Sequence, residues 1–207
     1  MRADLEAVFD EARRLGFVGG SSSVPHLRHA EAFVASIERL GGVDVGLDLG
    51  SGGGLPGLVL ADRWPDSRWY LVDASQRRAE FLSDAVVALG WTDRVEARRG
   101  RAETLARQPE LRGQVGVVTA RAFGPPAVTA ECGSGFLRVG GHLLVSEPPT
   151  AEPSRWSVPG LAELGLIEDA TGTVRGEEAH VQALRQDHPC PARYPRRDGV
   201  PAKRPLF

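Results

Sequence analysis

The chain has 207 residues, of which 42% are hydrophobic and 25% are charged, and its formal net charge is −2. This composition predicts one globular domain with a sizeable core. It excludes a protein that coats nucleic acid through overall positive charge, but not a local basic patch. The cysteines, Cys132 and Cys190, form no CxxC pair and predict free thiols in a reducing cytoplasm rather than a metal site. No apolar run has the length of a signal peptide core or a membrane span.

Apolar residues recur at helical spacing in two early segments, 5–15 and 27–40, and glycines follow both. After residue 42, short apolar runs alternate with helical patterns. The expected strands end at Leu49, Asp73, near Val95, at Thr119 and at Ser146, and the expected helices begin at Pro56, Ser75, Glu103 and Pro125, the last ending at Leu137. Segments 166–174 and 180–184 predict two later strands that form a hairpin edge. Such alternation is typical of an α/β fold with right-handed crossovers. We therefore expect a Rossmann-like doubly wound sheet of about seven strands, mostly parallel with an antiparallel C-terminal edge, plus N-terminal helices.

The segment from Asp48 to Gly57, DLGSGGGLPG, joins the first strand to a helix. A strand that ends in glycines and turns directly into a helix is typical of a nucleotide-cofactor loop, because the backbone must turn tightly and let a ligand approach. Pro56 suits the first turn of the helix, whose free N–H groups then point at the ligand. A glycine-rich turn without any ligand is the alternative.

Asp73 closes the next strand, about twenty residues after the glycines, where a carboxylate accepts both hydroxyls of a ribose. A helix N-cap at Asp73 or Ser75 is the alternative. With the glycine loop, Asp73 predicts an adenosine pocket.

Two cofactors fit such a pocket, since Gly52-x-Gly54-x-x-Gly57 also matches the dinucleotide fingerprint. Hydride transfer needs reaction groups that the sequence lacks, such as a Tyr-x-x-x-Lys pair. S-adenosylmethionine (SAM) carries an amino-acid moiety and a sulfonium, and Asp48 is placed for that positive end. The spacing of Asp48, Gly50, Gly52 and Gly54 resembles the first motif of class I SAM-dependent methyltransferases.

The last twenty residues, 188–207, are rich in proline, which argues against a regular helix or central strand. Basic residues outnumber the single acid, Asp198, and surround Tyr194. Arginine suits phosphate and tyrosine suits base stacking, so the segment predicts RNA contact. A solvated, disordered tail is the alternative. The predicted RNA-binding residues are Arg193, Tyr194, Arg196, Arg197, Lys203 and Arg204.

Several short motifs occur in an order that resembles the bacterial 16S rRNA guanine-N7 methyltransferases, the RsmG (GidB) family. They are the glycine loop, Asp73 with Arg77-Arg78 and Phe81-Leu82, Arg101-Ala102-Glu103, Arg121-Ala122 and the tail from Tyr194 to Leu206. The resemblance implies SAM as cofactor and 16S rRNA or the small ribosomal subunit as partner, in the cytoplasm. We expect a monomer without membrane attachment. Its expected parts are an N-terminal helical segment (1–42), a SAM-binding methyltransferase domain (43–187) and a basic tail (188–207).

The resemblance also implies roles for single residues. Gly50 and Leu55 would contact SAM, Asp73 its ribose, and Ala102 with Glu103 its adenine. Arg121, at the tip of the fourth strand, would lie beside the methyl group and is the catalytic candidate. The full predicted cofactor set is Asp48, Gly50, Gly52, Gly54, Leu55, Asp73, Ala102, Glu103 and Arg121. Structural alternatives are a core role for Leu55, a first-turn acid at Glu103 and a surface ion pair at Arg121.

The sequence departs from the family at two places. His29 stands where the family has His followed by Asp-Ser, but Ala32 and Phe33 follow it here, so we expect its ring to bond a backbone carbonyl. After the fifth strand the family has Lys-Gly, whereas this chain has Ser146-Glu147-Pro148-Pro149. We expect Glu147 at the mouth where a target base enters, with a structural turn made by the prolines as the alternative.

Guanine N7 has a free lone pair and no proton, so methyl transfer to it needs no general base. Catalysis would come from alignment of the reacting atoms, which supplies roughly 7–11 kcal/mol. Arg121 would hold a phosphate or the SAM carboxylate, because a clamp on O6 and N7 would block the acceptor.

Methylation of a small molecule or another RNA, suggested by Glu147 and the acidic balance, is one alternative. A non-catalytic RNA-binding assembly protein is another.

Overall fold

The fold is built around one mixed sheet. The computed structural model describes residues 3–20, 24–148, 155–176 and 179–207. Within these ranges the sheet has eight strands in the order β3-β2-β1-β4-β5-β8-β6, and β7 pairs with β8. The strands are β1 (Val45–Leu49), β2 (Arg68–Asp73), β3 (Val95–Arg99), β4 (Val115–Ala120), β5 (Leu137–Glu147), β6 (Leu166–Glu168), β7 (Val174–Arg175) and β8 (His180–Gln186). The predicted doubly wound α/β fold is confirmed.

Strands β1 to β5 run parallel, and β8 lies antiparallel to β5 at one side of the sheet. The chain winds outward from β1 to β3, then returns to place β4 on the other flank of β1. At this reversal the loops after β1 and β4 diverge to opposite faces, which leaves a crevice at the carboxyl ends of the two strands. The crevice lies beside residues 50 and 121, at the position where open α/β sheets bind their ligands.

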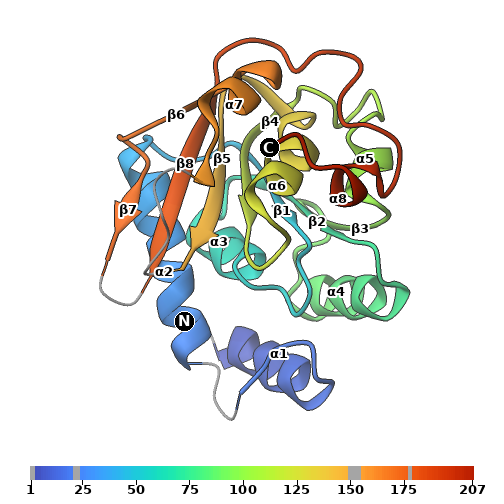
Figure 1. Cartoon of the computed structure of the whole chain (residues 1–207). Coiled ribbons are helices and arrows are strands. Elements are labelled where there is room, and N and C mark those ends of the chain that lie inside the picture. The colour runs from blue at the N-terminus through green and yellow to red at the C-terminus, as the bar shows by residue number, and fades with distance from the viewer. Residues whose placement is uncertain (1–2, 21–23, 149–154, 177–178) are drawn as a thin grey trace.

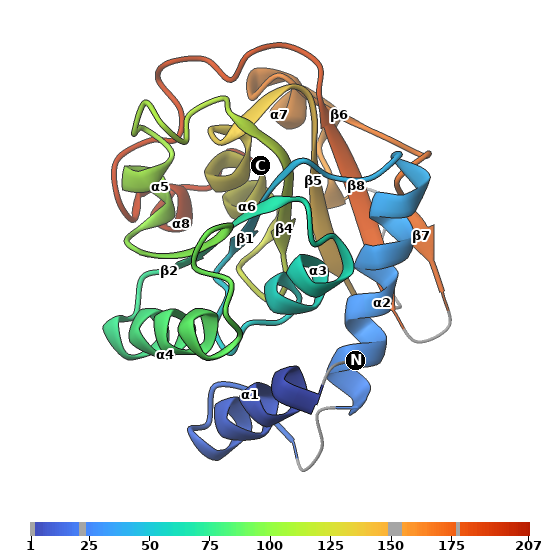
Figure 2. The same cartoon turned by 180° about the vertical axis from the view of Figure 1, so that it is seen from behind.

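The helices cover both faces of the sheet (Figures 1 and 2). One face packs against α2 (Val24–Arg39), α3 (Gly57–Arg63) and α4 (Gln76–Ala88), and the other against α5 (Ala102–Leu105), α6 (Pro126–Ser134) and α7 (Val158–Glu163). The apolar side chains on each face form a separate buried cluster, as the three-layer arrangement requires. No helix in the described ranges is long and apolar enough to cross a membrane.

The N-terminal helices belong to the first of these two clusters. Leu5 and Phe9 of α1 (Ala3–Arg14) are fully buried, and α1 lies against α4. A Cβ atom at Gly53 would lie 2.5 Å from Val18 and 3.2 Å from Ala12, so the glycine loop and the segment after α1 are in close contact. The early residues thus take part in shaping the site.

The boundary between α6 and β5 corrects the predicted one. The helix ends at Ser134 rather than Leu137, and β5 already begins at Leu137. The carbonyls of Gly135 and Phe136 accept hydrogen bonds from Gly113 and Val115, which draws this segment into the sheet. A helical apolar pattern alone could not reveal those partners.

Two later predictions are also corrected. Segment 166–174 is not one strand: β6 and β7 are separate, and both pair with β8. The proline-rich tail contains one short helix, α8 (Val200–Lys203), because Pro201 lies in its first turn, where a missing N–H has no cost.

Candidate active site

The glycine loop after β1 is fixed by backbone hydrogen bonds to the neighbouring strand. The amides of Gly50 and Ser51 both donate to the carbonyl of Val72, at 2.8 and 2.9 Å. Gly50 has a φ of +73°, and a Cβ atom there would lie 2.9 Å from the ring of Phe123. A side chain at this position would strain the backbone and fill the space between the loop and Phe123.

Asp73 ties the end of β2 to this loop. Its Oδ2 accepts a hydrogen bond from the Gly52 amide at 3.0 Å, and its Oδ1 accepts one from the Ser75 amide at 2.8 Å. Ser75 is the N-cap of α4, and its own side chain forms no capping bond. Each carboxylate oxygen has a second lone pair, so the carboxylate keeps acceptor capacity for ligand hydroxyls.

Two hollows meet at Gly50, on the carboxyl side of the sheet. The first, about 240 Å³, is lined by Asp73, Ala102, Glu103, Phe123 and Ala202 among others. We call it the adenosine hollow, after the ligand moiety that the sequence predicts for Asp73 and Glu103. The second, about 220 Å³, lies on the other side of Gly50, and we call it the Arg121 hollow. Its lining includes Phe17, His26, Gly52, Leu55, Arg78 and Arg121. Seven of the nine predicted cofactor residues therefore line one of two adjoining hollows.

Asp48 and Gly54 line neither hollow, unlike the other seven predicted cofactor residues. The Asp48 side chain is buried beneath the loop, where Oδ1 accepts from the Thr119 hydroxyl at 2.7 Å and Oδ2 from the Gly57 amide at 3.1 Å. A Cβ atom at Gly54 would lie 2.4 Å from Leu58, so this glycine permits helix packing. Protein atoms already surround the Asp48 carboxylate and the Gly54 Cα. Both residues therefore stabilise the loop from its buried side.

Burial raises the pKa of the Asp48 carboxyl to about 6, although the bonds from Thr119 and Gly57 oppose this. The folded state therefore binds the Asp48 proton more tightly than the unfolded chain, whose value is near 3.8. We expect Asp48 to destabilise the fold progressively as pH rises from about 4 to about 6. In urea unfolding, the stability of Asp48→Asn relative to the natural protein should rise over this interval. Parallel pH profiles for the two proteins would contradict the prediction.

Arg121 follows directly after β4, at the crevice between β1 and β4. Its Nη2 donates to Nδ1 of His26, and Nε2 of His26 donates to the carbonyl of Gly19 at 2.7 Å. The next residue, Ala122, has a φ of +53°, an uncommon conformation for a residue with a side chain. The strained turn and the histidine together fix the guanidinium in the hollow, so a surface ion pair is not its role.

Sequence reasoning missed several residues of the site. His26 and Phe17 come from the N-terminal segment, Arg78 comes from α4, and Phe123 follows the Arg121 turn. A sequence signal was available for two of them: Arg78 lies in the Arg77-Arg78 motif, and Phe123 lies beside the Arg121-Ala122 motif. His26 and Phe17 carried none, because only the packing of the early helices brings them to the loop.

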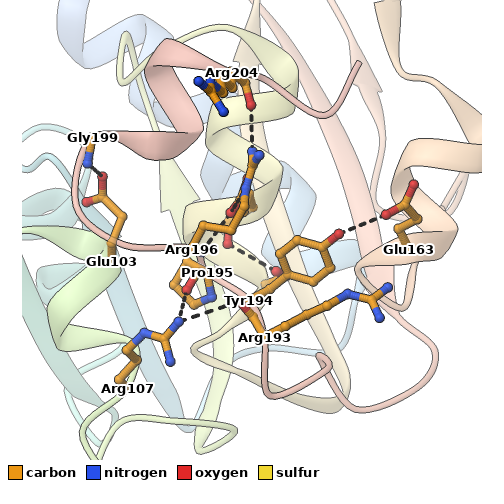
Figure 3. Close-up of polar contacts among 11 residues, drawn as sticks. Glu103, Arg107, Glu163, Arg193, Tyr194, Pro195, Arg196, Gly199 and Arg204 are labelled. Carbon is orange, nitrogen blue, oxygen red and sulfur yellow. Dashed lines mark hydrogen bonds and ion pairs between the residues drawn. The ribbon is translucent and has the colours of Figure 1, made fainter.

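The tail departs from its predicted role at two residues. Tyr194 is 5% exposed and its hydroxyl donates to Glu163 at 2.8 Å, so its ring cannot stack on an RNA base (Figure 3). Arg196 is bound to the fully buried Glu131, with Nη2 and Oε2 2.6 Å apart. These residues anchor the tail. The side chains of Arg193, Arg197, Lys203 and Arg204 are exposed, and their RNA contact stays a prediction.

Two expectations about departures from the family are also corrected. Glu147 is 5% exposed and its Oε2 accepts from Arg155 Nη1 at 2.9 Å, so it is a buried partner rather than an acid at the mouth. Pro149 lies outside the described residues. The buried Nε2 of His29 has no hydrogen-bond partner in the described part of the chain, so no backbone carbonyl satisfies it there. Burial lowers the pKa of His29, and the nearby Arg121 lowers it further.

Comparison with known proteins decides the family. The family model described as GidB, rRNA small subunit methyltransferase G, matches residues 28–150, which include the glycine loop, Asp73, Glu103 and Arg121. The ribosomal RNA small subunit methyltransferase G of Deinococcus radiodurans is 36% identical over 78% of this chain and 65% of its own length. That of Deinococcus deserti is 36% identical over 84% of this chain and 75% of its own length. The chain belongs to this family.

Solved structures resemble this family member in fold. An O-methyltransferase from Bacillus cereus, solved in complex with SAH, superposes with a TM-score of 0.62, covering 89% of this chain and 91% of its own, at 16% identity. A geranyl diphosphate methyltransferase in complex with SAM gives a TM-score of 0.56, covering 76% of this chain and 85% of its own, at 17% identity. At such identities the likeness concerns the fold alone.

Proposed function

We propose that this protein transfers a methyl group from SAM to N7 of a guanine in 16S ribosomal RNA. The observation that carries the proposal is the pair of hollows that meet at Gly50, with acids in one and Arg121 in the other. The family's rRNA methyltransferases supply the substrate class, and the B. cereus relative in fold was solved with the demethylated product of SAM. SAM, when bound, supplies the methyl group as an electrophile on a sulfonium.

The residues present fit an adenosine and an amino-acid moiety. Asp73 and Glu103 each offer a carboxylate at the wall of the adenosine hollow, where hydroxyls and an amino group need acceptors. The loop at Gly50 presents bare backbone where a Cβ atom would intrude. Arg121 offers a half-buried cation to the carboxylate of the amino-acid moiety or to an RNA phosphate. The two hollows thus offer carboxylates to the adenosine end of the cofactor and a cation to its amino-acid end.

The chain's own groups bind and orient, and none has to move a proton. N7 of guanine carries a lone pair and no hydrogen, so its attack on a methyl carbon releases no proton. The rate then depends on alignment and exclusion of water, which a rigid loop and a fixed guanidinium provide. Asp48 is buried and engaged with Thr119 and Gly57, so it is no candidate base.

The decisive experiment maps 7-methylguanine in 16S rRNA from cells with and without this gene, by reverse-transcription stops after chemical cleavage. We expect one guanine to lose its methyl group without the gene and to regain it when the gene is restored. Labelled methyl from SAM in a metabolite but never in rRNA would favour a small-molecule acceptor. SAM binding with no transfer at all would favour an assembly protein. The burial of Glu147 removes one of the two features that motivated a small-molecule acceptor, and the acidic balance of the chain is the other.

We propose that the exposed tail cations contact RNA phosphates. Each such contact should contribute about 0.7 to the slope of log affinity against log salt concentration. Replacing Arg193, Arg197, Lys203 and Arg204 with glutamine should flatten that slope by about this amount per residue. Filter binding to a 16S rRNA fragment at several salt concentrations measures it. The exposed Arg63, paired with Glu38 on another helix, provides the control Arg63→Gln. An unchanged slope in the tail variant would remove the tail from the interface.

A further inference from the structure

The C-terminal tail is anchored along α5 and α6 by contacts that do not involve its exposed cations. Arg112 Nη1 donates to the Tyr194 carbonyl at 2.9 Å. Arg107 Nη2 donates to the Pro195 carbonyl, as Figure 3 shows. A Cβ atom at Gly135 would lie 2.8 Å from Pro195, so the tail passes close to the end of α6. The segment is therefore part of the fold rather than a solvated arm.

The strongest anchor is the pair of Arg196 and Glu131. Three nitrogens of Arg196, the backbone amide, Nε and Nη2, donate to the carboxylate of Glu131, at distances from 2.6 to 3.1 Å. Glu131 is fully buried on α6, so this carboxylate depends on Arg196 for its charge partner. Arg196 Nη2 also donates to the Arg204 carbonyl at 2.7 Å, which fixes the end of α8.

Between these two fixed points, the tail forms a wall of the adenosine hollow. The Gly199 amide donates to Glu103 Oε1 at 2.9 Å, and Ala202 of α8 lines the hollow itself. Next to Gly199, Asp198 Oδ1 accepts from the Thr104 hydroxyl at 2.8 Å. Glu103 is the acid expected to face the adenine, and it is thus held from one side by the tail (Figure 3).

We propose that Arg196 and Glu131 are positioning residues for the cofactor: they hold residues 197–204 as a wall that orients Glu103, and so set the affinity for SAM. Coupling of this kind is reciprocal, so SAM should in turn stabilise the wall. The inference rests on the proposed function, because it assumes that the adenosine hollow takes SAM.

The test measures SAM binding by calorimetry to the full chain, without RNA. The double variant Arg196→Met with Glu131→Gln removes both charges together, which avoids a buried unpaired carboxylate. We expect its Kd for SAM to rise about tenfold, within the usual range of coupling between sites. Methylthioadenosine, which lacks the amino-acid moiety, should lose as much affinity as SAM. The control Asp169→Asn breaks the half-buried pair with His142, remote from the hollows, and should keep the natural Kd.

Kinetics separate positioning from damage to the catalytic step. At saturating SAM the double variant should keep the natural kcat, while its KM for SAM rises with the Kd. A folded double variant with natural Kd and KM would overturn the inference. A fall in kcat without a change in Kd would overturn it as well.

Hydrogen exchange tests the reciprocal effect in the unaltered protein. SAM should slow amide exchange in residues 197–204, which include the Gly199 amide, and should leave β6 and β7 unaffected.

If the double variant fails to fold, a milder variant tests the same coupling. Thr104→Val removes only the exposed bond to Asp198 and should raise the Kd for SAM about threefold. Unchanged exchange with SAM bound would overturn the inference. Absence of SAM binding to the natural protein would instead contradict the proposed function.

Discussion

Arg121→Ala should lower the rate of methyl transfer to 16S rRNA by about 10²–10³-fold while the protein stays folded. Removal of one preorganised hydrogen-bond donor that stabilises the transition state costs about this much in rate. Arg121 is held by His26 and follows the last residue of β4, so its guanidinium has a fixed position in the hollow. Transfer of labelled methyl from SAM to a 16S rRNA substrate measures the rate, and circular dichroism checks the fold.

The same variant distinguishes the two contacts proposed for Arg121. If the guanidinium holds the SAM carboxylate, the Kd for SAM should rise with the loss of rate. If it holds an RNA phosphate, the Kd for SAM should stay and the KM for RNA should rise. Arg138→Ala is the matched control, because Arg138 forms an exposed pair with Asp44 on another part of the sheet. A natural rate in Arg121→Ala would remove Arg121 from the mechanism.

Arg196→Met alone should destabilise the protein by about 3 kcal/mol, far more than loss of a surface ion pair. Removing one partner of a buried pair leaves an uncompensated charge and costs about 3–5 kcal/mol. The lower end applies here, because Glu131 is fully buried but the Arg196 side chain is 26% exposed. Urea unfolding followed by tryptophan fluorescence measures the free energy of unfolding.

Two further variants make this stability prediction specific. Arg138→Met breaks the exposed pair with Asp44 and should cost at most about 1 kcal/mol. Adding Glu131→Gln to Arg196→Met should recover part of the loss, since the buried charge is then gone. Equal costs for Arg196→Met and Arg138→Met would show that the buried pair does not anchor the tail.

The sequence predicts those parts of the site whose positions depend on neighbouring residues in the chain. The glycine loop and Asp73 lie at strand ends, and a parallel sheet brings strand ends together at one edge. Gly50, Gly52 and Asp73 therefore lie where the pattern indicates. Asp48 shows the limit of this reasoning. Its position before the glycines is diagnostic, but whether its carboxylate faces ligand or protein depends on Thr119, which pairs with it from another strand.

The other site residues could not be predicted, because contacts between distant segments of the chain determine where they lie. His26 reaches Arg121 across 95 positions, and Arg196 reaches Glu131 across 65, so neither partner is visible in a local pattern. The tail was predicted to bind RNA because it contains several basic residues and a tyrosine. In the structure, Tyr194 and Arg196 anchor the tail while its other basic side chains are exposed. Composition alone does not distinguish these two groups. Glu147 was misplaced for a different reason: its partner Arg155 lies only eight positions later, but the sequence does not show that the two side chains pair.

The walls of the two hollows come from widely separated parts of the chain, with Phe17 and His26 on one side and Ala202 on the other. During synthesis, the early helices and the sheet emerge long before residue 202 does. A chain in which residue 202 has not yet been synthesised lacks one wall of the adenosine hollow. We therefore expect the complete hollow to form late in folding, only after segment 197–204 has packed beside Glu103.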